Sequence, residues 1–155
     1  MHIHLLAVGN RMPGWVTEGY EEYARRMPRE CSLVLREIAP GKRGRHADIE
    51  RIREEEGERL LAALGRDSYR VALDVTGTAW STDELARDLS SWLQGGRDVC
   101  LLVGGPDGLS RRVLDQVHAR RSLSRLTFPH PLVRVILAEQ LYRAWTLLHH
   151  HPYHR

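Results

Sequence analysis

The sequence of 155 residues is poor in cysteine and has no long hydrophobic segment. Its two cysteines, Cys31 and Cys100, each stand in a short apolar run, so we expect buried reduced thiols rather than a disulfide or a nucleophile. No run reaches the roughly 18 apolar residues that cross a bilayer, and residues 1–4 do not open a signal peptide. These absences predict a cytoplasmic protein with no membrane partner.

Two common nucleotide-binding motifs are also missing. The sequence has neither the dinucleotide pattern G-x-G-x-x-G nor a Walker A segment, which disfavours a dehydrogenase or a phosphate-loop enzyme. A different glycine-rich segment, residues 103–110, follows an apolar run and precedes a helical pattern. Glycine lets a ligand approach the backbone closely, and a helix start offers unpaired N–H donors. We therefore interpret this segment as a ligand-binding loop, with a tight structural turn as the alternative.

Short apolar runs alternate with helical patterns along the whole chain. The strands are expected at residues 2–8, 32–38, 69–75, 99–103 and 126–128. The helices are expected at residues 13–27, 47–64, 81–96, 110–118 and 132–149. Such alternation predicts one α/β domain over residues 1–155, with a mostly parallel sheet flanked by helices. In these sheets ligands bind beyond the carboxyl ends of the strands, where Asp74 either contacts a ligand or caps a turn.

Charge is distributed unevenly between the two parts of the chain. Residues 1–103 hold 15 basic and 17 acidic side chains, whereas residues 104–155 hold 8 basic and 3 acidic ones. A basic end favours a polyanionic partner, and nucleic acid is the commonest. A second basic segment, residues 41–45, carries Lys42, Arg43 and Arg45 together with two glycines and is interpreted as a phosphate-seeking loop. A solvated loop without function is the alternative.

The expected last helix is apolar on nearly every side, so it is expected to meet the sheet on one side and a second subunit on another. Glu139 and Arg143 are spaced to form an ion pair on it. Arg134 has no acidic residue four positions away, so we expect it to face a ligand or RNA. The histidines of the tail, residues 149–155, lack the spacing of a metal site, and no metal is expected. The Tyr153-His154-Arg155 ending suits RNA better, and a disordered terminus is the alternative.

Several segments together closely resemble the bacterial large-subunit ribosomal RNA methyltransferase H family, a branch of the SPOUT methyltransferases. The most specific matches are residues 104–109, 123–135, 139–144 and 152–155. Further matches are residues 7–9, 12–13, 15, 41–44 and 47–49. The resemblance covers essentially the full chain in the family's order. It implies a single SPOUT domain whose cofactor-binding part, about residues 70–155, is threaded into a C-terminal trefoil knot.

The resemblance also implies an activity and its partners. The expected reaction transfers a methyl group from S-adenosylmethionine to N3 of a pseudouridine in large-subunit ribosomal RNA, leaving S-adenosylhomocysteine and needing no metal. The expected partners are the assembled ribosome and a second copy of the chain, joined through the last helix. The family's cofactor pocket corresponds here to Leu73, Gly104, Leu123, Ser124, Arg125, Leu126, Thr127 and Phe128.

The family's tail implies the catalytic groups. We expect Tyr153, His154 and Arg155 of one subunit to close over the target base of the other, with His154 assisting removal of the N3 proton. Lys42, Arg43, Arg45 and Arg134 are expected to bind RNA. Two alternatives stay open: a ribosome-binding assembly factor without catalysis, and a SPOUT methyltransferase that acts on transfer RNA.

Overall fold

The computed structural model describes residues 1–154, and the expectation for Arg155 lies outside these residues. Its centre is a sheet of five parallel strands in the order β2-β1-β4-β3-β5. The strands are β1 (His2–Val8), β2 (Ser32–Ile38), β3 (Tyr69–Ala79), β4 (Val99–Val103) and β5 (Ala119–Ser122). The predicted α/β class with a parallel sheet is confirmed.

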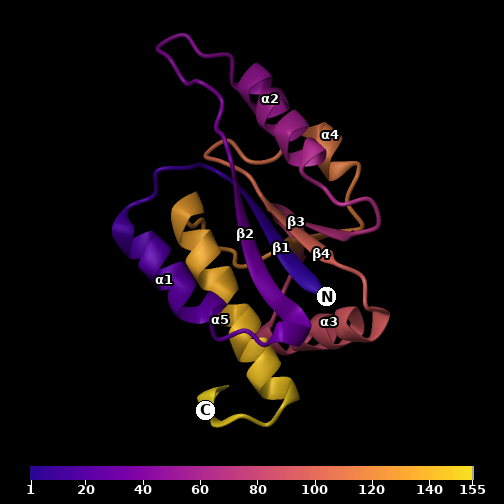
Figure 1. Cartoon of the computed structure of the whole chain (residues 1–155). Helices are drawn as coiled ribbons and strands as arrows, with labels where there is room; N and C mark the ends of the chain where they lie inside the picture. Colours follow the sequence, from indigo (N-terminus) through magenta and orange to yellow (C-terminus); the bar gives the residue numbers. More distant parts are fainter. Residues whose placement is uncertain (155) are drawn as a thin grey trace.

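Helices cover both faces of the sheet (Figure 1). They are α1 (Gly14–Ala24), α2 (Ile49–Ala62), α3 (Thr82–Gly95), α4 (Arg111–Leu114) and α5 (His130–Leu148), with short 3-10 turns at Arg29–Cys31 and Pro152–His154. Helices α1, α3 and α5 share one hydrophobic cluster with the sheet, and α2 and α4 share another. Right-handed crossovers on both faces are how parallel strands are ordinarily connected. No helix in residues 1–154 is long and apolar enough to span a membrane.

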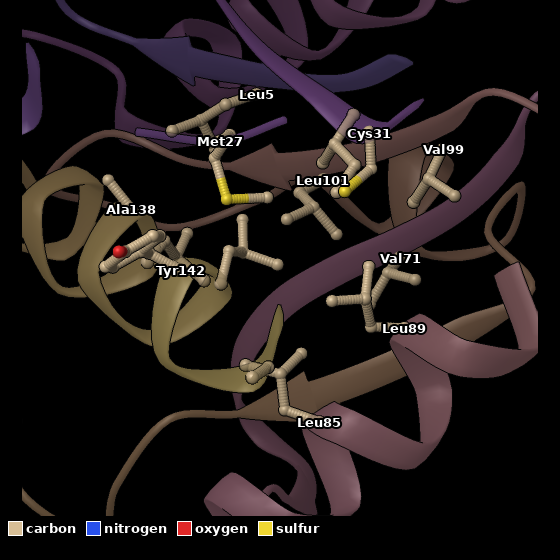
Figure 2. Close-up of a cluster of buried hydrophobic side chains, with 14 of the residues drawn as sticks. Leu5, Met27, Cys31, Val71, Leu85, Leu89, Val99, Leu101, Ala138 and Tyr142 are labelled. Atoms are coloured by element: carbon tan, nitrogen blue, oxygen red, sulfur yellow. The ribbon is translucent and has the colours of Figure 1, made fainter. Parts of the chain in front are cut away.

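Strand β4 lies at the centre of the sheet, between β1 and β3, and every one of its residues is buried. Its side chains alternate between the two clusters, with Leu101 facing α1, α3 and α5 and Leu102 facing α2 and α4. Figure 2 shows Leu101 among Leu5 of β1, Leu89 of α3 and Ala138 of α5. A strand covered on both faces needs a continuous apolar run, which the sequence Val-Cys-Leu-Leu-Val provides.

Capping residues define the ends of α2 and α3. Ser81 and Glu84 form a reciprocal capping box at the start of α3, and Gly96 ends this helix with a φ of 71°. Asp48 accepts hydrogen bonds from the N–H groups of Glu50 and Arg51 at the start of α2. These local bonds fix where the helices begin and therefore how the intervening loops reach the sheet edge.

The last strand differs from the prediction. Residues 126–128 form no strand, and the sheet edge is instead Ala119–Ser122, which pairs with β3. The sequence Ala-Arg-Arg-Ser has little apolar character, so its hydrophobic pattern gave no signal for an edge strand. Helix α4 is also one turn long rather than reaching residue 118. Segment 126–128 lies at a cavity rather than in the sheet.

Candidate cofactor and RNA site

A cavity of about 500 Å³ opens beyond the carboxyl ends of β3, β4 and β5. Most of its lining comes from three segments: the middle of β3, where its pairing with β4 ends, the glycine turn after β4, and the loop between β5 and α5. The lining residues are Arg53, Leu73, Asp74, Val75, Val103, Gly104, Gly105, Pro106, Asp107, Gly108, Leu109, Ser122, Leu123, Ser124, Leu126, Thr127, Phe128, His130 and Val133. The cavity lies where the strand-end rule predicts a ligand site, and its volume lies within the range of small-molecule sites.

The wall from β3 depends on a break in strand pairing. The pairing of β3 with β5 shifts between Leu73 and Thr78, so the residues between them leave the regular ladder. Asp74 and Val75 lie in this bulge and line the cavity, with the Thr76 hydroxyl hydrogen-bonded to the Asp74 carboxylate. Gly77 permits the bulge because a Cβ there would lie 2.7 Å from the backbone of Arg120. The prediction of a shorter third strand missed this extension.

The second wall is the turn that follows β4. Gly108 has a φ of +78° and donates its N–H to the carbonyl of Gly105 at 3.0 Å. Gly104 packs so closely that a Cβ on it would lie 2.6 Å from the carbonyl carbon of Gly108. The segment is therefore a tight structural turn, the alternative raised from the sequence, and it also lines the cavity. Its glycines serve the turn and bring backbone to the cavity surface.

The third wall is the loop after β5. The Ser122 hydroxyl donates to the carbonyl of Ser124 at 3.0 Å, and the Leu126 N–H donates to the Ser124 hydroxyl at 3.0 Å. Leu126 is 71% exposed, so this apolar side chain stands at the cavity wall with most of its surface uncovered. These two hydrogen bonds between side chain and backbone thus order the loop without strand pairing.

Most of the predicted pocket residues meet here. Those that line the cavity are Leu73, Gly104, Leu123, Ser124, Leu126, Thr127 and Phe128. Arg125 is the exception: it is exposed and does not line the cavity, so its inclusion in the pocket is corrected. Consecutive residues of an extended loop point in different directions, and the prediction had assigned the whole run.

Four charged or titratable side chains of the cavity were not predicted from the sequence. They are Arg53, Asp107, His130 and Asp74, the last of which had been left undecided. Asp107 and His130 stand inside the matched motifs and could have been found there, whereas Arg53 comes from α2 and gave no sequence signal. The Arg53 Nε is buried and has no hydrogen-bond partner within residues 1–154. An unpaired guanidinium N–H at a cavity wall is suited to an anionic or carbonyl group of a ligand.

His130 begins α5 at the cavity edge. Burial lowers the pKa of its imidazole, and the positive charges of Arg134 and Arg43 lower it further, against a smaller opposing effect of Glu56. The ring is therefore neutral at pH 7 and can accept a hydrogen bond or a proton.

The predicted RNA-binding role of Arg134 is corrected by the structure. Its side chain is 2% exposed, donates to the Glu37 carboxylate at 2.9 Å and also donates to the Gly9 carbonyl at 3.3 Å. Spacing along a helix indicates only partners on that helix, whereas Glu37 lies on β2. A buried and paired guanidinium is not available to a phosphate.

The basic segment 41–45 divides into two kinds of side chain. Lys42 and Arg45 are exposed, and neither forms an ion pair with any residue in the described part of the chain. Arg43 instead pairs with Glu56 and with Asp107, at 2.9 and 3.0 Å, and its side chain is 27% exposed. The expectation that Arg43 binds RNA stays a prediction, and its guanidinium already bonds two carboxylates.

The tail packs against the last turns of α5. The Tyr153 hydroxyl donates to Glu139 at 3.0 Å, and Arg143 both pairs with Glu139 and lies over the Tyr153 ring. The predicted Glu139–Arg143 pair is confirmed. The Nδ1 of His154 is buried and unpaired among residues 1–154. Burial and the Glu139 hydrogen bond raise the pKa of Tyr153.

Tail and cavity lie apart within one chain. Helix α5 contributes only its first turn, through His130 and Val133, to the cavity, and it runs about 28 Å away from that end. Figure 1 shows the described segment that follows α5 near the other end of this helix. None of residues 149–154 lines the cavity.

Neither a metal-binding cluster nor an exposed cysteine occurs among residues 1–154. No group of three or more His, Cys, Asp or Glu side chains within residues 1–154 is arranged to hold a metal ion. Cys31 and Cys100 are free and buried, as predicted. Burial raises the pKa of the Cys31 thiol to about 11, so it stays protonated.

The chain is similar over its full length to known methyltransferases. A family model described as "Predicted SPOUT methyltransferase" matches residues 1–154. "Ribosomal RNA large subunit methyltransferase H" of Methylococcus capsulatus is 65% identical over 155 residues and covers all of both chains. The protein of the same name from Chromohalobacter salexigens is 60% identical, also over all of both chains. That of Thioalkalivibrio sulfidiphilus is 59% identical over all of this chain and 99% of its own. The chain therefore belongs to the SPOUT methyltransferase family.

Proposed function

We propose that this protein methylates large-subunit ribosomal RNA, using S-adenosylmethionine as the methyl donor. The observation that carries the proposal is the cavity, because two of the segments most specific to the family, residues 104–109 and 123–135, converge on it. The printed names of the relatives, which are similar over their full length, support ribosomal RNA as the substrate.

The residues present fit this donor. The cavity combines apolar side chains for an adenine ring with two carboxylates for the cationic and hydroxyl groups, and Arg53 offers an unpaired N–H for a carboxylate. When bound, the donor supplies an electrophilic methyl group on a sulfonium, and its sulfur keeps the bonding electron pair as S-adenosylhomocysteine forms.

The chain's own task is positioning. Leu73, Leu123 and Leu126 supply apolar walls, and backbone groups of the Gly104 turn and of the Thr127 segment supply directional hydrogen bonds. Holding the methyl group in line with the attacking nitrogen makes the reaction effectively unimolecular within the complex. Covering the site also excludes water. No metal has a role in this chemistry.

The acceptor proposed is N3 of a pseudouridine on the assembled ribosome, and the N3 proton must leave as the N–CH₃ bond forms. Since the tail lies away from its own cavity, we propose a homodimer through α5, in which Tyr153, His154 and Arg155 of one subunit close over the base at the other subunit's cavity. His154 then assists proton removal, and Arg155 contacts phosphate or base oxygens. A C-terminal trefoil knot over about residues 70–155 and a cytoplasmic location belong to the same proposal.

The RNA backbone is proposed to bind at Lys42 and Arg45, the exposed charges of the basic segment. Replacing both by alanine is expected to weaken ribosome affinity and to reduce the slope of log affinity against log salt by about 2. An unchanged affinity and slope would reject these contacts.

The test of the activity is methyl transfer to purified ribosomes, with transfer RNA as the competing substrate. The proposal expects ribosomal RNA to be labelled and transfer RNA to remain unlabelled. Labelled transfer RNA would favour the other SPOUT activity. Titration of S-adenosylmethionine by calorimetry, with and without ribosomes, separates an enzyme from an assembly factor, which would bind ribosomes but no donor. A variant lacking residues 152–155 should bind donor yet lose turnover, and normal turnover would reject the role of the tail.

A further inference from the structure

A buried carboxylate outside the cavity anchors the basic segment. Glu56 lies in the middle of α2 and is 1% exposed. It accepts a hydrogen bond from the Gly41 N–H at 2.9 Å and pairs with Arg43 through Nη1 at 2.9 Å and Nη2 at 3.3 Å. A buried charge requires such partners, because desolvation without them costs several kcal/mol. The position of segment 41–45 is therefore fixed by this one carboxylate.

Arg43 bonds a second carboxylate with the rest of its guanidinium. Its Nε donates to Asp107 at 3.0 Å, and Asp107 lines the cavity in the turn after β4. Gly105 of the same turn packs directly on the pair, since a Cβ on it would lie 3.5 Å from both the Arg43 Nη2 and the Glu56 Oε1. One side chain thus joins the basic segment, helix α2 and the cavity wall.

The neighbours of Arg43 face outward. Lys42 and Arg45 are exposed, and the segment that carries them is held at its start by the Gly41 hydrogen bond to Glu56. A phosphate bound by these two side chains and a ligand in the cavity would therefore both act on the position of Arg43. Two sites that bias one shared element are energetically coupled, and the coupling is reciprocal.

We propose that Arg43 is a positioning residue that couples RNA binding to cofactor binding, by tying the RNA-facing segment 41–45 to the Asp107 turn of the cavity. RNA on Lys42 and Arg45 holds Arg43, and with it Asp107, in the arrangement that receives the cofactor. The cofactor in turn favours the segment arrangement that receives RNA. The inference rests on the proposed function and assigns to Arg43 a role other than contact with phosphate.

The test measures the affinity of the full chain for S-adenosylhomocysteine by calorimetry, without ribosomes and with saturating assembled ribosomes. Arg43→Ala is expected to weaken the affinity about tenfold without ribosomes, in line with losing a charge-assisted bond to the cavity wall. It should also abolish most of the increase that ribosomes cause in the parent chain. Arg51→Ala removes an exposed arginine of α2 that pairs with Glu55 of the same helix, and is the matched control expected to change neither value.

Two further variants separate positioning from folding. Arg43→Lys keeps the charge but cannot bond both carboxylates in the same planar geometry, so it should fold as the parent does and still show reduced coupling. In the double variant Arg43→Ala/Asp107→Asn, the loss of the ribosome-induced increase in affinity should be no greater than in Arg43→Ala alone, since both changes break the same link.

Retention of the parent's affinity and of its full ribosome dependence in Arg43→Ala and Arg43→Lys would overturn the proposal. A double variant that loses clearly more of the ribosome-induced increase than Arg43→Ala does would also overturn it. A parent chain that binds no S-adenosylhomocysteine under either condition would instead reject the proposed function, and the coupling with it.

Discussion

Replacement of Gly104 by alanine tests the cavity wall at its tightest point. The new Cβ would lie 2.6 Å from the carbonyl carbon of Gly108 and 2.7 Å from its oxygen, both of them backbone atoms. An ordinary contact between these two carbon atoms needs roughly 0.9 Å more, because carbon atoms reach their optimal separation only at about 3.5 Å. The turn must open by several tenths of an ångström, and the Gly108 hydrogen bond to Gly105 lies in the same turn.

The expected cost is about 1–3 kcal/mol in the free energy of unfolding, as for other overpacked sites. The displaced wall should also weaken S-adenosylhomocysteine binding by about tenfold or more, which corresponds to about 1.4 kcal/mol. Urea denaturation followed by circular dichroism measures the first quantity, and calorimetric titration the second.

Gly14→Ala is the control for this experiment. Gly14 is the first residue of α1 and has no atom within 4 Å of its Cβ position. Its replacement should leave binding unchanged and add up to about 1 kcal/mol of stability through reduced freedom of the unfolded chain. Parent-like stability and affinity in Gly104→Ala would refute the packing argument.

Two further predictions concern the arginine and histidine at the start of α5. Arg134→Met removes the bonds to Glu37 and Gly9. The free energy of unfolding should fall by about 1–3 kcal/mol. We expect a value near the lower end of this range, because Glu37 is 40% exposed and water can replace its lost partner. The salt dependence of ribosome affinity should stay that of the parent, and a flatter slope would contradict the buried placement. For His130 the folded-state pKa is lowered, so the unfolded chain binds its proton first as the pH falls through about 6.5. The parent should therefore lose stability relative to His130→Asn between pH 7 and pH 5, and equal pH dependence in denaturant titrations would refute the shift.

The sequence predicted the layers of the fold well where the hydrophobic pattern was strong. Strand β4 is a continuous apolar run, and the helix expected at residues 81–96 is α3, Thr82–Gly95. Strand β5 was missed because an edge strand with two arginines does not differ in pattern from a loop. The apolar segment 126–128 was predicted as a strand in its place. Apolar residues occur at ligand cavities as well as in sheets, and the hydrophobic pattern does not distinguish the two.

The candidate site was predictable where its residues lie in the specific motifs, and not where it depends on contacts between distant segments. Arg53 reaches the cavity from α2, and Glu37 reaches Arg134 across 97 residues of chain. Arg43 was assigned to RNA because spacing alone cannot show that Glu56 and Asp107 occupy its guanidinium. Charge counted along a sequence identifies basic segments, but only tertiary structure shows which charges are already paired.

The knot, the dimer and the role of the tail stay predictions from the resemblance. Helix α5 is buried partly against α1 and α3 within the chain, so its apolar character does not by itself require a second subunit. The separation of the tail from its own cavity is the feature of this structure that supports a composite site.

The most direct test of the central claim is nucleoside mass spectrometry of ribosomal RNA. Assembled ribosomes lacking the modification are incubated with the full chain and S-adenosylmethionine carrying a labelled methyl group, and their large-subunit RNA is digested to nucleosides. The account predicts one labelled N3-methylpseudouridine per large-subunit RNA, and none with the variant lacking residues 152–155. Unlabelled ribosomal RNA, or label on a different nucleoside, would contradict it.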